Sequence, residues 1–562
     1  MKRELPLIIC LAASMHASIG IAQQRYVEEV FTDAQLEISP NITYGTNIDF
    51  LTSNFSSPDV PANITELQTA ISNGTMIPAA YYDPTNTSTA VKVKDLQMDI
   101  YAPDADEDDV ELRPLVIYVH TGNALPPPLN GSPVGTRTDS SAVEICKRMA
   151  RRGYVAASIS YRLGWNPLAP SEEERRGSLL NAIYRAIHDV RQSVRYLKQT
   201  ASEGNPHGIC TSRITVIGEG TGGYISLANA TLNDPAELFI EKFRPDPFDP
   251  TVSYIDTNMV GNLEGFNGQL TLYRPNGYDH STHFCVNLGG ALADISWLED
   301  GDVPMVAFHT VFDPFAPFTE GIVIVPTTGG PVVPVHGSNF FMEVVNEFGN
   351  NDAFADLPNG DPFTDRARAL YGSTHVHGSN SVTINENVEG LFPLVTPDWP
   401  AQQAGLNEEA GPWQWWDPNS PVAQAVVAQP NITAHMAASA SNPNMSASKA
   451  RAVIDTVMGY LNPRILAALD LNAECGGVGM DEQDHEISIN IYPNPAADRI
   501  TITSGSGMIT RYALFDAQGR EVLQGTPNSD RIDLDRKGLA AGEYLLRSQL
   551  GERITTRKFV LH

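Results

Sequence analysis

A short stretch near the middle of the chain constrains the fold more than any other. Residues 214–217 form a largely apolar run, and glycines follow at positions 218, 220, 222 and 223. Residues compatible with a helix come after the last of these glycines, so the pattern predicts a strand, a tight turn and then a helix. Open α/β sheets bind ligands at the carboxyl ends of their strands. We therefore expect an α/β domain with its site beside this turn.

The sequence around this turn alternates short apolar strands with helical stretches, as in a mainly parallel sheet flanked by helices. We expect strands at residues 96–101, 115–120, 155–160, 214–218, 285–288, 303–309 and 391–395. Helical periodicity predicts helices over residues 141–152 and 179–198, and the second has an apolar stripe that suits a sheet. We expect its opposite face to be solvated; that face carries Arg185, Asp189, Gln192 and Lys198.

Charge and hydropathy limit the partners of this chain. The 562 residues include 37 Lys and Arg against 66 Asp and Glu, a net charge of −29 that would repel nucleic acid. Residues 1–22 have a basic start, an apolar stretch and small residues at the end, which predicts a secretory signal peptide. No later stretch approaches about 18 uninterrupted apolar residues, so we expect an exported protein without a transmembrane segment.

Four cysteines remain after the expected cleavage, namely Cys146, Cys210, Cys285 and Cys475. Export permits disulfides, and four cysteines allow three pairing schemes. The spacings match no zinc or haem pattern. We therefore expect one or two structural disulfides, or buried thiols, and no cofactor.

Several motifs in the right order resemble α/β-hydrolases of the secreted carboxylesterase type. The glycine turn resembles the nucleophile elbow G-x-S-x-G, framed here by Gly218 and Gly222. Residues 115–122 resemble the strand and H-G-G turn that supplies an oxyanion-hole amide, and residues 152–164 and 287–313 resemble later strands. The resemblance implies an α/β-hydrolase fold, with Asp313 at the position of the triad acid.

The residues that would perform ester hydrolysis depart from this resemblance. Gly220 stands where the family has its nucleophilic serine, and glycine has no side chain with which to attack. Thr221, one position later, is an alternative nucleophile. The oxyanion-like turn consists of Thr121 and Gly122, and Thr121 replaces a glycine.

The general base is also missing from its expected place. A triad histidine should follow the last strand, but residues 396–400 contain none. His375 and His377, slightly earlier, are candidate bases; as H-x-H on a strand they would suit a metal, but we favour two surface loop histidines and predict no metal site. Trp399 and residues 412–417 either line a ligand pocket or, as we favour, pack an insertion onto the core.

The C-terminal part has a different character, with strands of alternating polarity after a glycine-rich stretch. Motifs at residues 491–496, 514–519, 539–544 and 558–561 occur in the order of the C-terminal sorting domain of the bacterial type IX secretion system, which they resemble. The resemblance implies a Bacteroidetes-type bacterium, a small all-β sandwich and transport by the type IX machinery. It further implies release from the cell or attachment to the cell surface.

These observations predict the organisation of the whole chain. We expect a signal peptide (1–22), an N-terminal extension (23–95), an α/β-hydrolase-like domain (96–471), a linker (472–485) and a sorting domain (486–562). For function, we favour a non-catalytic or very weakly active protein that binds a small-molecule or carbohydrate ligand. The alternative is an active secreted esterase that uses Thr221 or a metal-activated water.

Overall fold

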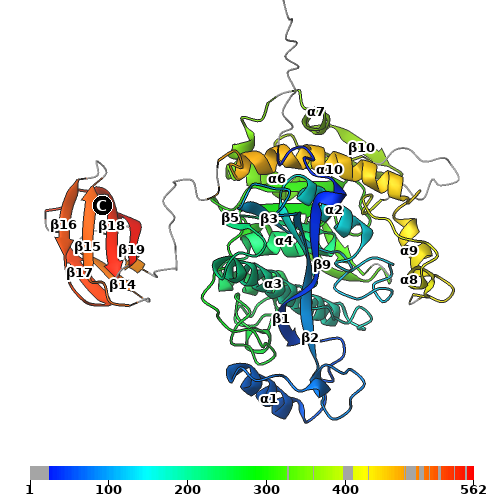
Figure 1. Cartoon of the computed structure of the whole chain (residues 1–562), viewed down its shortest axis with the longest axis horizontal. Coiled ribbons are helices and arrows are strands. Elements are labelled where there is room, and N and C mark those ends of the chain that lie inside the picture. The colour runs from blue at the N-terminus through cyan, green and yellow to red at the C-terminus, as the bar shows by residue number, and fades with distance from the viewer. Residues whose placement is uncertain are drawn as a thin grey trace, which may run out of the picture. The chain divides into compact units, whose positions relative to one another are not determined.

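The computed structural model describes most of the chain, and the described residues fall into two compact units (Figure 1). The first lies within residues 25–475, and the second begins beyond Cys475 and also includes residues 277–279. The described residues are 25–325, 328–358, 360–395, 409–427, 429–473, 475, 489–492, 496, 499–504, 507–516, 520–536, 538–550 and 553–561. The expected signal peptide and Trp399 lie outside them. Within them, no helix is long and apolar enough to cross a membrane.

The first unit contains an eight-stranded sheet in the order β1-β2-β4-β3-β5-β6-β7-β12. Its strands are β1 (Leu36–Ile48), β2 (Val93–Pro103), β3 (Arg113–Val119), β4 (Val155–Ile159), β5 (Ile209–Glu219), β6 (Phe284–Leu288), β7 (Met305–Thr310) and β12 (Leu391–Leu394). The strands β4, β3, β5, β6, β7 and β12 run parallel to one another. Strand β2 is antiparallel to β4, and β1 is antiparallel to β2. The expected mainly parallel sheet is therefore confirmed, and each central strand is buried on both faces.

Helices cover both faces of this sheet. The helices of the unit are α1 (Val60–Ser72), α2 (Ser140–Arg151), α3 (Glu172–Ser202), α4 (Thr221–Thr231), α5 (Thr257–Val260), α6 (Ser338–Glu347), α7 (Pro362–Arg368), α8 (Pro421–Gln424), α9 (Ala434–Ala440) and α10 (Ala447–Ala468). Alternate residues of β3 pack into two cores, one shared with α3, α4 and α6 and the other with α2 and α10. Figure 1 shows α3 and α10 on opposite sides of the sheet.

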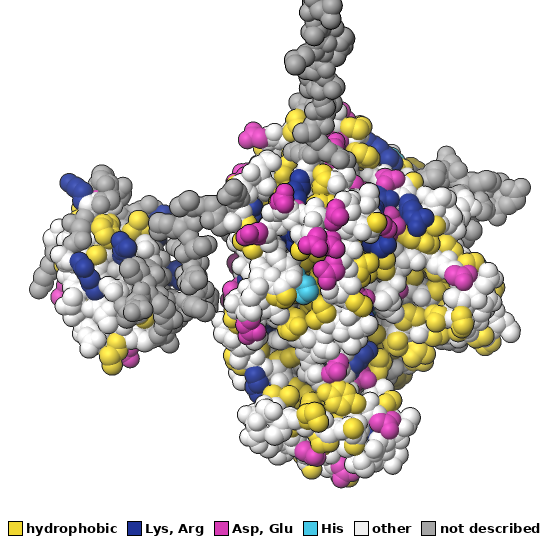
Figure 2. Space-filling view, in the orientation of Figure 1, with side chains coloured by type: hydrophobic (Ala, Val, Ile, Leu, Met, Phe, Trp, Pro, Cys, Tyr) yellow, Lys and Arg dark blue, Asp and Glu magenta, His cyan; other side chains and the backbone are white. Residues whose placement is uncertain are grey.

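The first unit also contains two β-hairpins and a long insertion outside the eight-stranded sheet. The hairpins are β8 (Glu320–Ile324) with β9 (Pro331–His336), and β10 (Thr374–His377) with β11 (Asn380–Thr383). The insertion follows β12 and contains α8 and α9. The space-filling view in Figure 2 shows Asp and Glu side chains over much of this unit, in keeping with the net charge of −29.

The expectation that the polar face of α3 is solvated was wrong. Arg185 and Asp189 are 3% and 0% exposed, and Lys198 is also buried. Asp189 pairs with Arg162 (Nε to Oδ1 2.9 Å) and accepts a hydrogen bond from the Tyr273 hydroxyl at 2.8 Å. These charges are buried because segments distant in sequence lie over the helix and supply ionic, hydroxyl and carbonyl partners.

The second unit consists of antiparallel strands in two sheets. Their orders are β13-β14-β17 and β16-β15-β18-β19. The strands are β13 (Ile489–Tyr492), β14 (Arg499–Ser504), β15 (Arg511–Asp516), β16 (Glu521–Gly525), β17 (Arg531–Asp535), β18 (Gly542–Leu550) and β19 (Arg553–Leu561). Apolar side chains of both sheets form one core, as in a β-sandwich.

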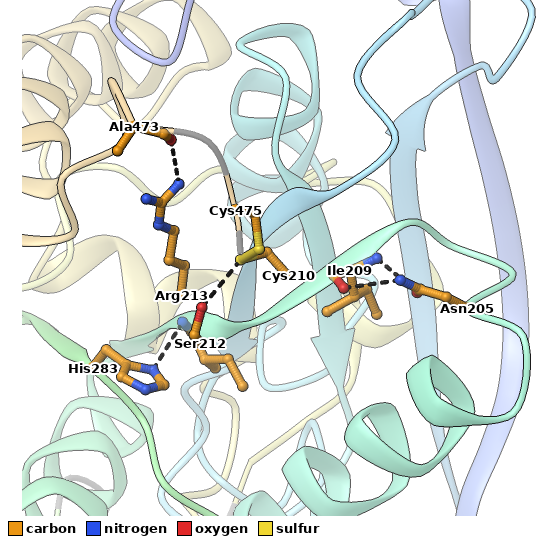
Figure 3. The surroundings of a disulfide bond; sticks show 9 residues. Asn205, Ile209, Cys210, Ser212, Arg213, His283, Ala473 and Cys475 are labelled. Atoms are coloured by element: carbon orange, nitrogen blue, oxygen red, sulfur yellow. Dashed lines mark hydrogen bonds between the residues drawn. A yellow bond between two sulfur atoms is a disulfide. The ribbon is translucent and has the colours of Figure 1, made fainter. Parts of the chain in front are cut away.

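A disulfide ties the end of the first unit to its central strand. Cys475 is bonded to Cys210 on β5, with their Cα atoms 6.0 Å apart, across 265 residues of chain (Figure 3). Arg213 Nη1 donates to the Ala473 carbonyl at 2.8 Å and adds a second tie beside it. Cys146 and Cys285 are buried free thiols. Of the options left open by the sequence, one structural bridge is therefore present.

Candidate active site

The glycine turn joins β5 to α4 in the geometry of a nucleophile elbow. Gly220 lies between the strand and the helix with φ 52° and ψ −111°, a conformation that L side chains rarely adopt. The framing glycines permit close packing, since a Cβ on Gly218 would lie 1.9 Å from the Gly222 carbonyl oxygen. The turn therefore has the shape that presents a nucleophile, but position 220 has no side chain to present.

The space above Gly220 is filled by Thr121. A Cβ placed on Gly220 would lie 2.3 Å from Thr121 Oγ1 and 3.1 Å from Thr121 Cβ. A serine at position 220 would therefore require Thr121 to move. The two departures from the esterase pattern are physically linked, because the larger residue on one turn occupies the volume left by the smaller residue on the other.

Thr221 uses its hydroxyl for a contact inside the same structure. Thr221 Oγ1 accepts a hydrogen bond of 2.7 Å from the backbone N–H of Asn123, in the turn that follows β3. This turn approaches residue 135 closely, since a Cβ on Gly122 would lie 2.7 Å from Gly135 Cα. The Asn123 amide, on the turn expected to bind an oxyanion, thus already has an acceptor.

Asp313 follows β7 and is buried, with its side chain 3% exposed. Its Oδ1 accepts hydrogen bonds from the backbone N–H groups of Phe315 (2.8 Å) and Ala316 (2.9 Å), but burial dominates and raises the pKa of Asp313 to about 7. His309 Nε2 lies 4.0 Å from Asp313 Oδ2. Burial lowers the pKa of His309 to about 4, so this imidazole is neutral and forms no ion pair with Asp313.

His375 and His377 lie on β10, in a strand rather than in the surface loop that we favoured. His375 Nε2 lies 2.8 Å from Ser373 Oγ, and the ring of His377 packs on Phe312 at 5.5 Å between centroids. Neither lines the cavity that reaches Gly220. Among the residues with described positions, no three His, Cys, Asp or Glu side chains gather to hold a metal.

A cavity of about 700 Å³ opens beside the elbow. Five of the candidate catalytic and turn residues line it, namely Thr121, Gly122, Gly220, Thr221 and Asp313, and so do two residues of the range 412–417. The rest of its wall comes mainly from α3, the β8–β9 hairpin and the insertion with α8 and α9. Its volume lies within the range of about 300–1,000 Å³ typical of small-molecule sites.

Two residues that matter at this site were not identified from the sequence. Tyr224, on the first turn of α4, lines the cavity. Glu219, directly before Gly220, is fully buried and accepts hydrogen bonds from four donors. These donors are Tyr118, Ser141, Trp413 and Gln414. The position of Glu219 at the end of an otherwise buried strand was the signal that could have drawn attention to it.

Trp413 belongs to the tryptophan cluster for which two roles were considered, and it has both. It is 1% exposed and packs the insertion onto the core, yet it also lines the cavity. Its indole N–H donates to Glu219 Oε1 at 3.0 Å. The ring lies against Gly289, since a Cβ built on this glycine would be 3.4 Å from Trp413 and 3.9 Å from Asp313 Oδ2.

The mainly parallel sheet with helices on both faces and the strand–turn–helix elbow give the first unit the fold of an α/β-hydrolase. Comparison with sequence families gives two matches, "BD-FAE" over residues 98–264 and "Secretion system C-terminal sorting domain" over residues 490–562. The first match includes the elbow and the oxyanion-like turn and ends before Asp313. The chain therefore carries an esterase-like α/β-hydrolase domain and a type IX sorting domain, as their motifs indicated.

Comparison with solved structures gives similarities of low identity. Esterase 2 of Thermogutta terrifontis, in a form phosphoramylated by tabun, is 18% identical over 40% of this chain and 70% of its own, with a TM-score of 0.26. MGS-M1, an α/β-hydrolase enzyme from a deep-sea metagenome library, is 16% identical over 40% of this chain and 66% of its own, with a TM-score of 0.23. PorZ of Porphyromonas gingivalis is 19% identical over 13% of this chain and 11% of its own, with a TM-score of 0.13. No curated protein matches the chain.

Proposed function

We propose that this protein is an exported pseudoenzyme, an esterase-like α/β-hydrolase with little or no esterase activity that binds a small ligand in the cavity beside its elbow. The observation that carries the proposal is Gly220 at the nucleophile position. Acyl transfer by a Ser-His-Asp triad needs a hydroxyl at that position, which glycine cannot supply.

Two further features of the site support a loss of catalysis. Thr121 fills the volume that a serine side chain at position 220 would occupy, and the Thr221 hydroxyl accepts a hydrogen bond from the Asn123 amide. A tetrahedral intermediate would need such an amide for its oxyanion. No histidine among the described residues lines the cavity, so Asp313 has no imidazole to orient there.

The sorting domain indicates export by the type IX system to the cell surface or the medium. To this we add, as part of the proposal, a signal peptide over residues 1–22 and a Bacteroidetes-type origin. The partners would then be the type IX machinery, through the C-terminal domain, and a small molecule or carbohydrate in the cavity.

An active hydrolase is the second candidate, and Asp313 is the observation that favours it. A carboxyl group with a pKa of about 7 in a cavity has the proton affinity of a general base at neutral pH. In that case Thr221 or a metal-activated water would be the nucleophile. Before Thr221 could act as the nucleophile, the hydrogen bond from the Asn123 amide to its hydroxyl would have to break.

Hydrolysis of p-nitrophenyl acetate and butyrate by the full chain separates the two functions. We expect no rate above that of the heat-denatured protein, either for the wild type or for Gly220→Ser, because a serine alone lacks a base and meets Thr121. The double variant Thr121→Gly/Gly220→Ser removes that contact and tests whether the base is also missing. Turnover by the wild type that Thr221→Ala abolishes would establish an enzyme and refute the proposal.

A further inference from the structure

The cavity has an apolar wall that suits a ligand with an apolar body. Its lining includes side chains from α3 and from the β8–β9 hairpin, and seven aromatic residues contribute to the described wall. These aromatic residues are Trp165, Tyr184, Tyr224, Phe243, Trp297, Phe315 and Trp413. Apolar area of this kind supplies binding energy but does not select the polar end of a ligand.

Asp313 is the one charged or chargeable Asp, Glu, Lys, Arg or His among the described residues of this wall. The nearest imidazole, His309, is occupied elsewhere: its Nδ1 lies 2.8 Å from Ser338 Oγ and its Nε2 3.1 Å from the Ala316 carbonyl oxygen. Residues 396–408, which the structure does not describe, contain no Lys, Arg or His. A buried carboxylate without a cation is costly, so Asp313 must either hold a proton or meet a cation from outside the chain.

A second polar group near Asp313 forms no hydrogen bond within the described residues. The Tyr224 hydroxyl oxygen is buried and forms no hydrogen bond with any described residue. Asp313 is near enough for its charge to add to the effect of burial, and both raise the pKa of Tyr224. Asp313 and Tyr224 therefore offer two oxygen acceptors to one ligand group, and the ring of Trp413 lies close to Asp313 at Gly289.

We propose that the cavity binds an organic cation, an ammonium group on an apolar body, with the ammonium between Asp313 and Tyr224. This inference rests on the proposed function, since it requires a site that binds a ligand without cleaving an ester. An ammonium donates to both oxygens, compensates the buried carboxylate and is attracted to aromatic rings. A carboxylate ligand would meet Asp313 without a cation, and a sugar would leave many hydroxyl groups against an apolar wall.

Three probes of equal length test the charge preference in the full chain: octylammonium, octanol and octanoate. Binding is measured by isothermal titration calorimetry at a pH of about 8. We expect octylammonium to bind at least about tenfold more tightly than octanol, and octanoate to bind most weakly. Asp313→Asn should remove most of this preference, because it should weaken octylammonium binding much more than octanol binding, and Tyr224→Phe should also weaken octylammonium more than octanol.

Two neighbouring residues on β8 provide a matched control for the place of binding. Val323 lines the cavity, whereas Ile322 does not and is 49% exposed. Val323→Trp should abolish binding of every probe, and Ile322→Trp should leave it intact. Binding of octanol or octanoate as tight as that of octylammonium overturns the cation assignment, and if Val323→Trp still blocks it, the proposed binding function stands. Failure of octylammonium to bind at all also overturns the assignment, whereas esterase turnover refutes the proposed function itself.

Discussion

Removal of the Asp313 charge should change how stability depends on pH. The folded protein holds the Asp313 proton up to a pKa of about 7, whereas the ordinary value in an unfolded chain is 3.8. The folded state therefore binds more protons than the unfolded state between these values, and its stability falls as the pH rises through this window. This loss of stability is absent below the pKa of Asp313 in the unfolded chain and complete above its pKa in the folded protein.

The size of the effect follows from the two pKa values. From about pH 5 to the folded pKa of about 7, each pH unit costs about 1.4 kcal/mol, which amounts to about 2–3 kcal/mol of unfolding free energy by about pH 8. Asp313→Asn keeps the shape of the side chain and an oxygen for the amides of Phe315 and Ala316, but it cannot ionise. Relative to wild type, the variant should thus gain about 2–3 kcal/mol between about pH 5 and about pH 8.

Urea unfolding followed by tryptophan fluorescence measures this difference. All six tryptophans precede Cys475, so the signal reports on the hydrolase-like unit alone. Other buried carboxyls, such as Asp139 with a pKa raised by burial to about 7, contribute equally to both proteins and cancel in the comparison. Asp109→Asn, at an exposed position, controls for the substitution. A difference below about 0.5 kcal/mol between the two pH values would refute a buried, unpaired Asp313.

Three further predictions concern stability. Replacement of Cys210 and Cys475 by alanine should cost up to about 5 kcal/mol in urea unfolding, because the bridge closes a loop of 265 residues; an unchanged midpoint would contradict this. Glu219→Gln should lower the unfolding free energy by about 2–3 kcal/mol in the same assay, because the new side-chain NH₂ group would face hydrogen-bond donors instead of accepting from them. An unchanged unfolding free energy would mean that the network rearranges freely. Gly220→Ser should lower the unfolding free energy by about 1–3 kcal/mol, partly through backbone strain and partly through the clash with Thr121. In a double-mutant cycle, Thr121→Gly should restore only the part due to the clash; strictly additive effects of the two changes would exclude the contact.

The fold was predictable because its signals are local. Each central strand is a short apolar run, and the elbow has glycines at fixed spacing. A window of about ten residues is therefore enough to identify each of these elements. The order of the motifs placed Asp313 at the triad-acid position, which stays a prediction; the structure shows that Asp313 lines the cavity beside the elbow. The same local information revealed that Gly220 lacks a side chain, although not that Thr121 fills the resulting space.

The errors and omissions concern contacts between distant parts of the chain. Arg185 and Asp189 fall on the polar face of a helix, and their burial depends on residues such as Phe50 and Tyr273 that lie far away in sequence. The choice among three disulfide pairings likewise depends on the final fold. The approach of Trp413 to Glu219 spans 194 residues, which no periodicity reports.

The two departures at the elbow and the hydrogen bond of Thr221 are easier to understand together than singly. A residue at φ 52° is strained unless it is glycine, so Gly220 removes a strain that a nucleophile would have to bear. Its missing side chain leaves room that Thr121 fills, and the Asn123 amide beside it is satisfied by Thr221. On our proposal, these contacts stabilise the resting protein and leave no group that binds a transition state better than the ground state. On our proposal, Asp313 still has a role at this site, because a buried carboxylate without a neighbouring cation has a high affinity for a positive charge.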